Sequence, residues 1–299
     1  MKFVIAGGSG FIGQKLTDIL LSANHEVIIL SRQVKNPVGK VSYVRWLAEG
    51  SLPEKEIGEA DVFINLAGVS INDGRWTASH QKEIYESRII ATTELIRIIK
   101  AMERKPSVLI NASAIGIYPA STMTRYTEES TEIAQDFLGK TVYDWEQKAK
   151  SVEQLGLRVA FMRFGVVLGH EGALPLMVMP YKFLVGGPVG SGKQWVSWVH
   201  VEDVAKSILF VAENKEIHGP VNVTSPNPVQ MNEFGKTIGS VLKRPHWIPA
   251  PSFAMKAVLG KKSALVLEGQ SVLPEKLLHN EYEFAYPKLE MALENLLKG

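Results

Sequence analysis

The strongest constraint on the fold is a glycine pattern between an apolar run and a helical pattern at the start of the chain. Residues 2–6 are apolar and favour a strand, and residues 14–21 carry apolar side chains at helical spacing. The glycines between them are Gly7, Gly10 and Gly13. This spacing permits a tight turn, a close approach to a pyrophosphate, and close helix packing. It predicts a dinucleotide site with helix-start contacts at Phe11 and Ile12. The alternative is a structural glycine turn in another α/β protein.

Composition excludes several classes of protein. The chain has 299 residues, of which 45% are hydrophobic and 21% charged, so it can form one large or two modest globular domains. Its formal net charge of +2 argues against nucleic acid and against an anionic membrane as partners. It contains no cysteine, which excludes disulfides, thiolate metal sites and cysteine nucleophiles.

Location and metal content are predicted from what the sequence lacks. No apolar run reaches membrane-spanning length, and the first strand begins at residue 2, which leaves no room for a signal peptide. We therefore expect a cytoplasmic protein. The seven histidines show no spacing typical of metal ligands, so we predict no metal site.

The end of the second predicted strand, residues 25–30, indicates which dinucleotide binds. NAD-specific sites usually place an acidic residue there, which bonds the ribose 2′-hydroxyl, whereas an arginine accommodates a 2′-phosphate. Here Ser31 and Arg32 follow the strand and no carboxylate stands nearby. A serine hydroxyl and a guanidinium can both bind a phosphate, so we favour NADP(H) over NAD(H). The alternative is that Arg32 is only a solvated loop charge.

Strands and helices alternate through the first half of the chain. This alternation predicts right-handed crossovers and a parallel sheet. Further strands are expected at 41–46, 60–68, 108–112, 158–169 and 219–224, and a helix capped by Thr77 at 77–102. Prolines divide the C-terminal part into short segments, which predicts a small, mostly helical lobe with helices at 229–242, 252–259 and 287–297.

Several motifs together resemble a known family. The glycine spacing is similar to that of extended short-chain dehydrogenase/reductases, with Ala6 where threonine is usual. The combination resembles the atypical members often called epimerase family proteins; its motifs are Asn65–Gly68, Ser87–Arg88, Trp145–Glu146, Gly186–Pro188, Gly190–Gln194, Asn222–Pro226, Arg244–Pro245 and Leu273–Leu277. The resemblance implies a Rossmann-like, doubly wound parallel sheet with a smaller C-terminal substrate domain. Residues 1–165 and 196–224 would form the NADP(H)-binding domain, and residues 166–195 and 225–299 the substrate domain.

The resemblance also implies cofactor contacts outside the glycine turn. The segment Leu66, Ala67 and Gly68 would run beside the cofactor, where its small residues leave room for adenosine and ribose. Glu83 and Arg88 lie on the helix expected beside the cofactor, and Arg88 stands where extended members often carry asparagine. The alternative is that both charges belong to a solvated helix face.

The catalytic positions depart from the family pattern. Ser113 lies one residue before the place of the usual catalytic serine. Tyr143 is the candidate phenol, but the following lysine, Lys148, is five residues away instead of four, roughly 140° around a helix. A lysine so placed is better positioned to pair with Asp144. His200 could titrate near neutrality, although such a residue is more often a hydrogen-bonded structural histidine.

Two hypotheses from different classes follow. The first is an NADP(H)-dependent oxidoreductase or epimerase that acts on a small polar or sugar-like substrate, with Ser113 and Tyr143 handling protons. The second is a cofactor-binding regulatory protein without turnover, motivated by the Tyr143–Lys148 spacing. A homodimer on the sheet-flanking helices is a family-level expectation. Gly187–Lys193 matches a nucleoside-triphosphate loop, but Gln194 stands where serine or threonine is needed, so we disfavour that function.

Overall fold

The computed structural model describes residues 1–33 and 36–298. A seven-stranded sheet in the order β11-β7-β5-β4-β1-β2-β3 forms its centre, and every neighbouring pair is parallel. The predicted doubly wound sheet is thus confirmed. Its strands are β1 (Lys2–Ala6), β2 (Glu26–Ser31), β3 (Val41–Arg45), β4 (Val62–Asn65), β5 (Val108–Ala114), β7 (Arg158–Phe164) and β11 (Gly219–Val223).

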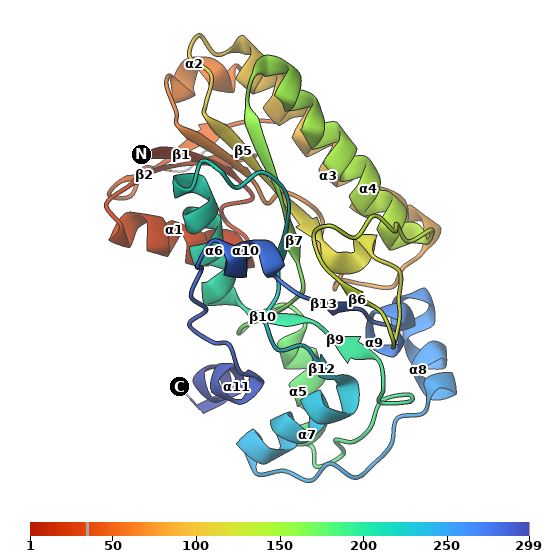
Figure 1. The fold of residues 1–299 in the computed structure, drawn as a ribbon. Coiled ribbons are helices and arrows are strands. Elements are labelled where there is room, and N and C mark those ends of the chain that lie inside the picture. The colour runs from red at the N-terminus through yellow and green to blue at the C-terminus, as the bar shows by residue number, and fades with distance from the viewer. Residues whose placement is uncertain (34–35, 299) are drawn as a thin grey trace.

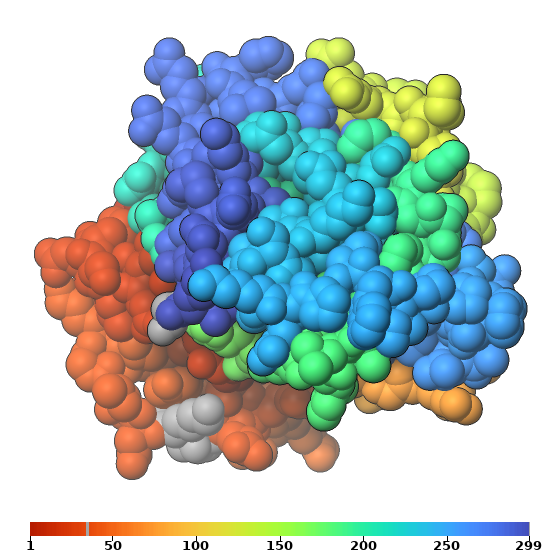
Figure 2. All heavy atoms as spheres, turned by 90° about the horizontal axis from the view of Figure 1, so that it is seen from below, coloured from red at the N-terminus to blue at the C-terminus, as the bar shows by residue number. Residues whose placement is uncertain are grey.

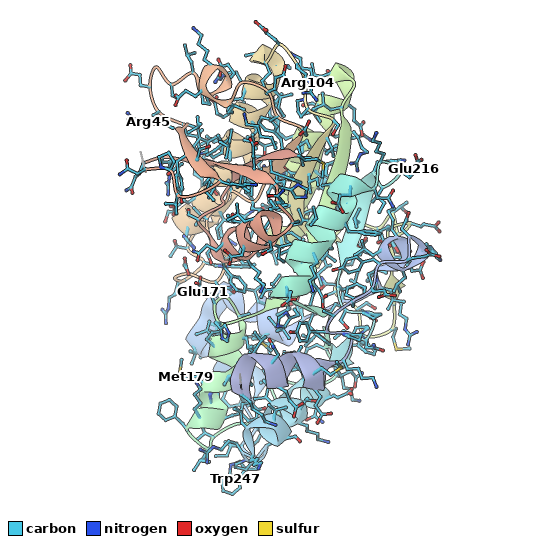
Figure 3. All side chains as sticks on the ribbon, turned by 90° about the vertical axis from the view of Figure 1, so that its left-hand side faces the viewer. Arg45, Arg104, Glu171, Met179, Glu216 and Trp247 are labelled. Carbon is cyan, nitrogen blue, oxygen red and sulfur yellow. The ribbon has the colours of Figure 1, made fainter. Side chains whose placement is uncertain are left out.

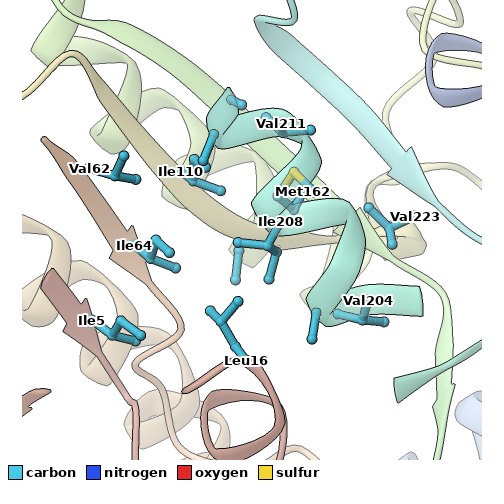
Figure 4. Packing of buried hydrophobic residues seen from close by; sticks show 14 of the residues in the cluster. Ile5, Leu16, Val62, Ile64, Ile110, Met162, Val204, Ile208, Val211 and Val223 are labelled. Carbon is cyan, nitrogen blue, oxygen red and sulfur yellow. The ribbon is translucent and has the colours of Figure 1, made fainter. Parts of the chain in front are cut away.

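Helices cover both faces of this sheet (Figure 1). One face packs against α1 (Phe11–Ser22) and α6 (Val201–Glu213), and the other against α2 (Pro53–Ile57), α3 (Ala78–Ala101) and α4 (Phe137–Lys150). The first core cluster joins strand residues such as Ile5 and Ile110 to Leu16 of α1 and Ile208 of α6 (Figure 4). Strands buried on both faces explain the near-continuous apolar runs in the sequence.

The predicted long strand over residues 158–169 is divided in two. β7 ends at Phe164, and β8 (Val166–Leu168) leaves the main sheet to pair with β10 (Trp198–His200). Gly165 lies between them, and a Cβ atom there would come within 2.2 Å of the Ser197 carbonyl oxygen. This close approach of two backbones requires glycine and directs the chain out of the sheet.

The C-terminal lobe, which forms the lower part of the molecule in Figure 1, has its own small apolar core. Trp198 and Phe234 are among its fully buried side chains. The sequence did not predict helices α5 (Leu174–Lys182) and α10 (Glu275–His279). The lobe contains α5 (Leu174–Lys182), β9 (Trp195–Val196), β12 (Val229–Gln230), α7 (Met231–Leu242), α8 (Ser252–Leu259), α9 (Ala264–Leu267) and α11 (Leu289–Lys298).

The chain returns to the sheet between α9 and α11. β13 (Ser271–Val272) pairs in parallel with β6 (Arg125–Tyr126), and α10 (Glu275–His279) packs beside β11. Leu277 and Tyr282 join the core cluster of the main sheet. Through these contacts, the C-terminal part of the chain packs against the half of the molecule that contains the main sheet.

His200 stands at the junction of the two halves as the N-cap of α6. Its Nδ1 accepts a hydrogen bond from the Glu202 N–H at 3.1 Å, and its Nε2 lies 3.2 Å from Asn295 Oδ1. Burial lowers the pKa of His200 to about 4. The imidazole is therefore neutral near pH 7 and has a structural role.

We predict that His200 makes the protein acid-sensitive. Its folded-state pKa lies below the ordinary value of 6.5, so the unfolded chain binds the extra proton first, and stability falls as pH drops from about 6.5 toward 4. Between pH 7 and 4.5 this group should account for about 2 kcal/mol of unfolding free energy. Urea titrations of wild type and His200→Asn, which keeps a capping side chain, measure this difference. Identical pH slopes in the two proteins would contradict it.

Candidate functional site: a glycine cradle and a buried ion pair

The glycine turn between β1 and α1 has no room for side chains at two positions. Gly7 has a φ of +82°, and a Cβ there would lie 2.7 Å from the Leu66 carbonyl oxygen. A Cβ on Gly13 would lie 2.4 Å from the Gly7 oxygen. Gly10 is different, because its Cβ would meet only the Gly7 oxygen at 3.4 Å. Gly7 and Gly13 are thus required by packing, whereas Gly10 leaves space open in front of the helix.

The first turn of α1 has the features of an anion site. Gly10 is its N-cap, no side chain caps it, and no acidic residue lies in the first turn. The Phe11 ring lies against Gly169 beyond β8, and Ile12 packs against the apolar core. Phe11 and Ile12 therefore present only backbone N–H groups at the helix start, where they favour negative charge.

Ser31 and Arg32 lie at the end of β2, next to the glycine turn. Ala6 pairs in register with Leu30, which places Ser31 one residue beyond the end of β1. The Ser31 hydroxyl accepts from the Gln33 N–H at 3.1 Å, and Arg32 is exposed. Arg45, which sequence reasoning missed, pairs in register with Ser31 and is also exposed. Two exposed arginines thus lie near Ser31.

The segment after β4 is held by buried amides. Asn65 Nδ2 donates to Thr92 Oγ1 at 2.9 Å and to Asn111 Oδ1 at 2.7 Å. Asn65 Oδ1 accepts from the Ala67 N–H at 3.2 Å, and the Leu66 N–H continues the ladder to the Ala6 oxygen at 2.8 Å. These bonds place Leu66, Ala67 and Gly68 beside the glycine turn.

Arg88 lies directly over Gly68. A Cβ on Gly68 would be 3.1 Å from Arg88 Cζ, and the guanidinium stands 5.2 Å from the Trp145 ring centroid. Its Nη1 donates to the Val69 and Ile84 carbonyls at 3.1 and 2.8 Å. Burial lowers the pKa of Arg88 to about 10, so it remains charged at neutral pH. No described carboxylate forms an ion pair with this cation.

Glu83 lies elsewhere on α3 and is exposed. Within the described ranges its carboxylate approaches only the ring of His80, with Nδ1 at 3.4 Å. Glu83 and Arg88 are five residues apart, so their side chains leave the helix about 140° from each other. The structure brings Arg88 to the glycine turn and leaves Glu83 on a solvated face.

Ser113 belongs to a buried ion-pair network at the end of β5. Its Oγ donates to Glu146 Oε1 at 2.5 Å. Arg163 of β7 makes two parallel bonds to the same carboxylate, Nε to Oε1 and Nη2 to Oε2, both at 2.8 Å. Glu146 and Arg163 are almost fully buried. Burial alone would lower the pKa of Arg163, but the hydrogen bonds and charge of Glu146 outweigh it and raise the pKa.

The network continues from Arg163 to a buried phenol. Arg163 Nη1 donates to the Tyr118 hydroxyl at 2.8 Å. That hydroxyl lies 2.9 Å from both the Thr127 carbonyl oxygen and Asn222 Oδ1, either of which can accept its single proton. Burial raises the pKa of Tyr118, so it is a neutral phenol. The network therefore links β5, α4, β7 and β11.

Tyr143 lies about 60° around α4 from Glu146, toward solvent. The buried residues of this helix include Glu146, which contacts Ser113 and Arg163 of the sheet, and Val142, which packs with Ile117 and Tyr118. Tyr143 is 39% exposed, in a stripe with Lys140 and Gln147. No hydrogen bond joins Tyr143 to Ser113 in the described part of the chain. The buried face of α4 thus carries Val142 and Glu146, whereas Tyr143 and Gln147, four residues later, are exposed.

The predicted pairing of Lys148 with Asp144 is wrong. Asp144 instead pairs with Lys140, one turn earlier, with Nζ and Oδ2 2.9 Å apart. It also accepts from the Tyr85 hydroxyl at 3.0 Å. The Asp144 carboxylate is therefore already occupied, by Lys140 of the same helix and by Tyr85 of α3.

Two further sequence features lead to no site. The loop Gly187–Lys193 precedes β9 instead of a helix, and Gln194 Nε2 donates to the Val189 and Val266 carbonyls. It is a structural loop without the helix that a triphosphate site needs. Among the described residues, no group of three or more His, Asp or Glu side chains could hold a metal ion.

Comparisons with known sequences show the family. The NAD dependent epimerase/dehydratase family matches residues 3–224, and a domain of unknown function (DUF1731) matches residues 250–296. The chain is 48% identical over 298 residues to the epimerase family protein YfhF of Bacillus subtilis, covering 99% of this chain and 98% of that protein. An epimerase family protein of Staphylococcus aureus strain N315 is 42% identical over 300 residues, with 99% of both covered. The chain belongs to the NAD dependent epimerase/dehydratase family.

Solved structures show the same fold. The human epimerase family protein SDR39U1 (isoform 2), solved with NADPH, superposes with a TM-score of 0.89 at 33% identity and full coverage of both chains. A UDP-glucose 4-epimerase of Thermus thermophilus, in complex with NAD, has a TM-score of 0.79 at 17% identity, covering 100% of this chain and 98% of that one. The second likeness establishes the fold alone. No helix in the described ranges is long and apolar enough to cross a membrane.

Proposed function

We propose that this chain binds NADP(H) at the glycine turn and acts as an NADP(H)-dependent oxidoreductase or epimerase-like enzyme on a small polar substrate. The observation that carries the proposal is the glycine cradle, because two positions exclude any Cβ while Gly10 leaves space before an uncapped helix start. The NADPH in the human relative, 33% identical, supports the same ligand. A homodimer and a cytoplasmic location stay predictions from the sequence.

The residues around the turn fit a dinucleotide. The N–H groups of Phe11 and Ile12 would receive the pyrophosphate, and Ser31 and Arg32 the 2′-phosphate. The segment at Gly68 would run along the adenosine and ribose. Arg88, a partly buried cation with no carboxylate partner among the described residues, would face a ligand anion or ribose oxygen. When bound, the cofactor supplies hydride exchange at its nicotinamide. Glu83 is a weaker candidate for a cofactor contact because it is exposed.

We predict that Arg32 sets the preference for NADP(H). Arg32→Ala should weaken NADPH binding about 10- to 100-fold, because hydrogen bonds to charged groups contribute roughly 1.5–3 kcal/mol. Binding of NADH should change little, since it lacks the 2′-phosphate. Calorimetric titration measures the ratio of the NADPH affinity to the NADH affinity in each protein. Lys100→Gln on α3 serves as a distant charge control. If Arg32→Ala weakens both ligands equally, the assignment of the 2′-phosphate to Arg32 fails.

Proton handling is proposed for Ser113, supported by Glu146. The Ser113 hydroxyl donates to Glu146, so its oxygen is left as an acceptor for a substrate hydroxyl. When Ser113 Oγ accepts a proton from the substrate hydroxyl, its own hydroxyl hydrogen would move to the carboxylate of Glu146, whose orientation Arg163 maintains. Tyr143 remains the second candidate, and would act only if a substrate reached the exposed side of α4.

A cofactor-binding protein without turnover is the alternative function. It is favoured by the Tyr143–Lys148 spacing of five residues, where the family pattern has four, and by the exposure of Tyr143. A panel of carbonyl, alcohol and nucleotide-sugar substrates, assayed with NADPH and NADP, separates the two. Turnover that falls at least tenfold in Ser113→Ala and persists in Tyr143→Phe would support the Ser113 assignment. Tight cofactor binding with no turnover on any substrate would favour the alternative.

A further inference from the structure

The far end of the C-terminal lobe exposes a group of large apolar side chains. We define the apolar tip as the end of α5 and the segment after α7, with Met179, Phe183, Leu184, Val185, Trp247 and Ile248. All six are exposed, with 71% of Phe183 and 66% of Trp247 accessible. Figure 3 shows Met179 and Trp247 at the end of the molecule opposite Arg45 and Arg104. The tip is therefore remote from the sheet.

Backbone contacts hold the two parts of the tip together. The Trp247 N–H and the Ile248 N–H both donate to the Gly186 oxygen, at 2.9 and 3.2 Å. The Trp247 indole Nε1 donates to the Leu184 carbonyl at 2.8 Å. Figure 2 shows this end face, where atoms of α5 and of the segment after α7 lie side by side. The apolar side chains thus form one ordered surface.

Leu184 is held in a conformation that leucine rarely adopts. Its φ is +62°, in the left-handed region that favours glycine. It follows the last turn of α5, where the Leu184 N–H bonds to the Tyr181 oxygen and the Val185 N–H to the Pro180 oxygen. A leucine here costs backbone strain, and 47% of it remains exposed, so the isolated chain gains little from the side chain.

The surroundings of the tip are basic. Lys182 ends α5, and Lys243 and Arg244 follow α7 directly; all three are exposed. The segments 172–193 and 234–267 contain eight of the 33 lysines and arginines and none of the 31 acidic residues. The remaining 25 basic and 31 acidic residues give the rest of the chain a net charge of −6. The C-terminal lobe as a whole, residues 166–195 and 225–299, contains eleven basic and eight acidic residues, so its positive charge is concentrated in these two segments.

We propose that the apolar tip is a docking surface for an anionic lipid membrane. Exposed tryptophan and phenylalanine with flanking lysine and arginine is the combination that partitions into a headgroup region. Lys182, Lys243 and Arg244 would face lipid phosphates while the apolar side chains enter the acyl boundary. The net-charge argument against an anionic membrane does not apply to these two segments, which carry no acidic residue. A cation at a helix C-terminus also interacts favourably with the helix dipole. This interaction explains Lys182 but not the exposed aromatic rings.

Charge also decides between a membrane and a second copy of the chain. A two-fold dimer through the tip would place the three cations of one copy against those of the other. No acidic residue lies in the two segments to offset this repulsion. An anionic lipid surface has the complementary charge, and it covers apolar side chains without requiring a matching groove.

Vesicle flotation tests the proposal. Phosphatidylcholine vesicles with and without about one third phosphatidylglycerol are mixed with the full chain at low and at physiological ionic strength. We expect binding to the anionic vesicles only, weaker at the higher salt. The triple variant Lys182→Gln, Lys243→Gln, Arg244→Gln should lose on the order of 100-fold in partitioning. Phe183→Ser should reduce vesicle partitioning about tenfold or more.

Leu184→Gly separates docking from folding. Glycine relieves the left-handed strain, so this variant should raise the melting temperature while weakening vesicle binding. Met123→Ser, an exposed apolar residue outside the tip, is the matched control and should bind like wild type. Failure of wild type to float with the anionic vesicles overturns the proposal, as does binding that none of the tip variants weakens. A dimer that Phe183→Ser dissociates, without vesicle binding, would identify a second copy as the occupant instead.

Discussion

Replacing Glu146 with leucine should destabilise the protein by about 3–5 kcal/mol, the cost of removing one partner of a buried ion pair. Arg163 would keep its charge in a nearly fully buried position with no carboxylate beside it. Ser113 would also lose the acceptor of its hydroxyl. Urea denaturation monitored by circular dichroism measures the loss.

Two controls separate the buried charge from general disruption. Glu86→Ala removes one partner of the exposed Lys82–Glu86 pair on α3 and should change the free energy of unfolding by less than about 0.5 kcal/mol. The double variant Glu146→Leu, Arg163→Met removes both charges and should recover at least half of the single variant's loss. Tyr118 keeps Asn222 and Thr127 as partners in that double variant. A double variant no more stable than Glu146→Leu would refute the ion-pair explanation.

Alanine substitutions at Gly13 and Gly10 should have different effects. Gly13→Ala should destabilise the fold, whereas Gly10→Ala should weaken NADPH binding. Gly13→Ala should cost about 3 kcal/mol or more, because its Cβ would stand 2.4 Å from the Gly7 oxygen and 2.6 Å from the Gly8 Cα. These are backbone atoms that cannot move aside without displacing the turn. Gly10→Ala should fold normally, since Gly10 has an extended φ of −83° and its Cβ meets one oxygen at 3.4 Å.

Binding then distinguishes Gly10 from a merely structural glycine. A methyl group on Gly10 occupies the space where a pyrophosphate must approach the backbone. We expect Gly10→Ala to weaken NADPH binding on the order of 10- to 100-fold, the loss of about one charge-assisted hydrogen bond. Denaturation and NADPH fluorescence titration of both variants give the two numbers. Unchanged affinity in a normally folded Gly10→Ala would place the phosphates elsewhere.

Most of the main sheet could be predicted because its signals are local. The turn after β1, the apolar strands and the Thr77 cap, whose Oγ1 accepts from the His80 N–H, each depend on neighbouring residues. Helix α5 was missed because prolines at 175 and 180 and a nearly uniform apolar composition hide the helical period. The break at Gly165 depends on Ser197, which is distant in sequence, and no local pattern reports it.

The ion pair at Ser113 illustrates what sequence reasoning lacked. The rotation of α4 about its axis decides whether Tyr143 or Glu146 faces the sheet, and tertiary packing sets that rotation. One signal was present, because Arg163 interrupts an otherwise apolar strand and a charge buried in a sheet needs hydrogen-bonding partners, most often an opposite charge. That signal indicates that a partner exists, while the fold is needed to identify Glu146.

The most direct measurement is a thermal shift of the wild-type protein with NADPH, NADP, NADH and NAD, made after denaturation and absorbance have shown that no cofactor co-purifies. A ligand that binds the folded chain raises the melting temperature by mass action. The account predicts clear shifts with NADPH and NADP and much smaller shifts with NADH and NAD at equal concentration. Equal shifts with all four would contradict the role of Arg32, and no shift with any would contradict dinucleotide binding at the glycine turn.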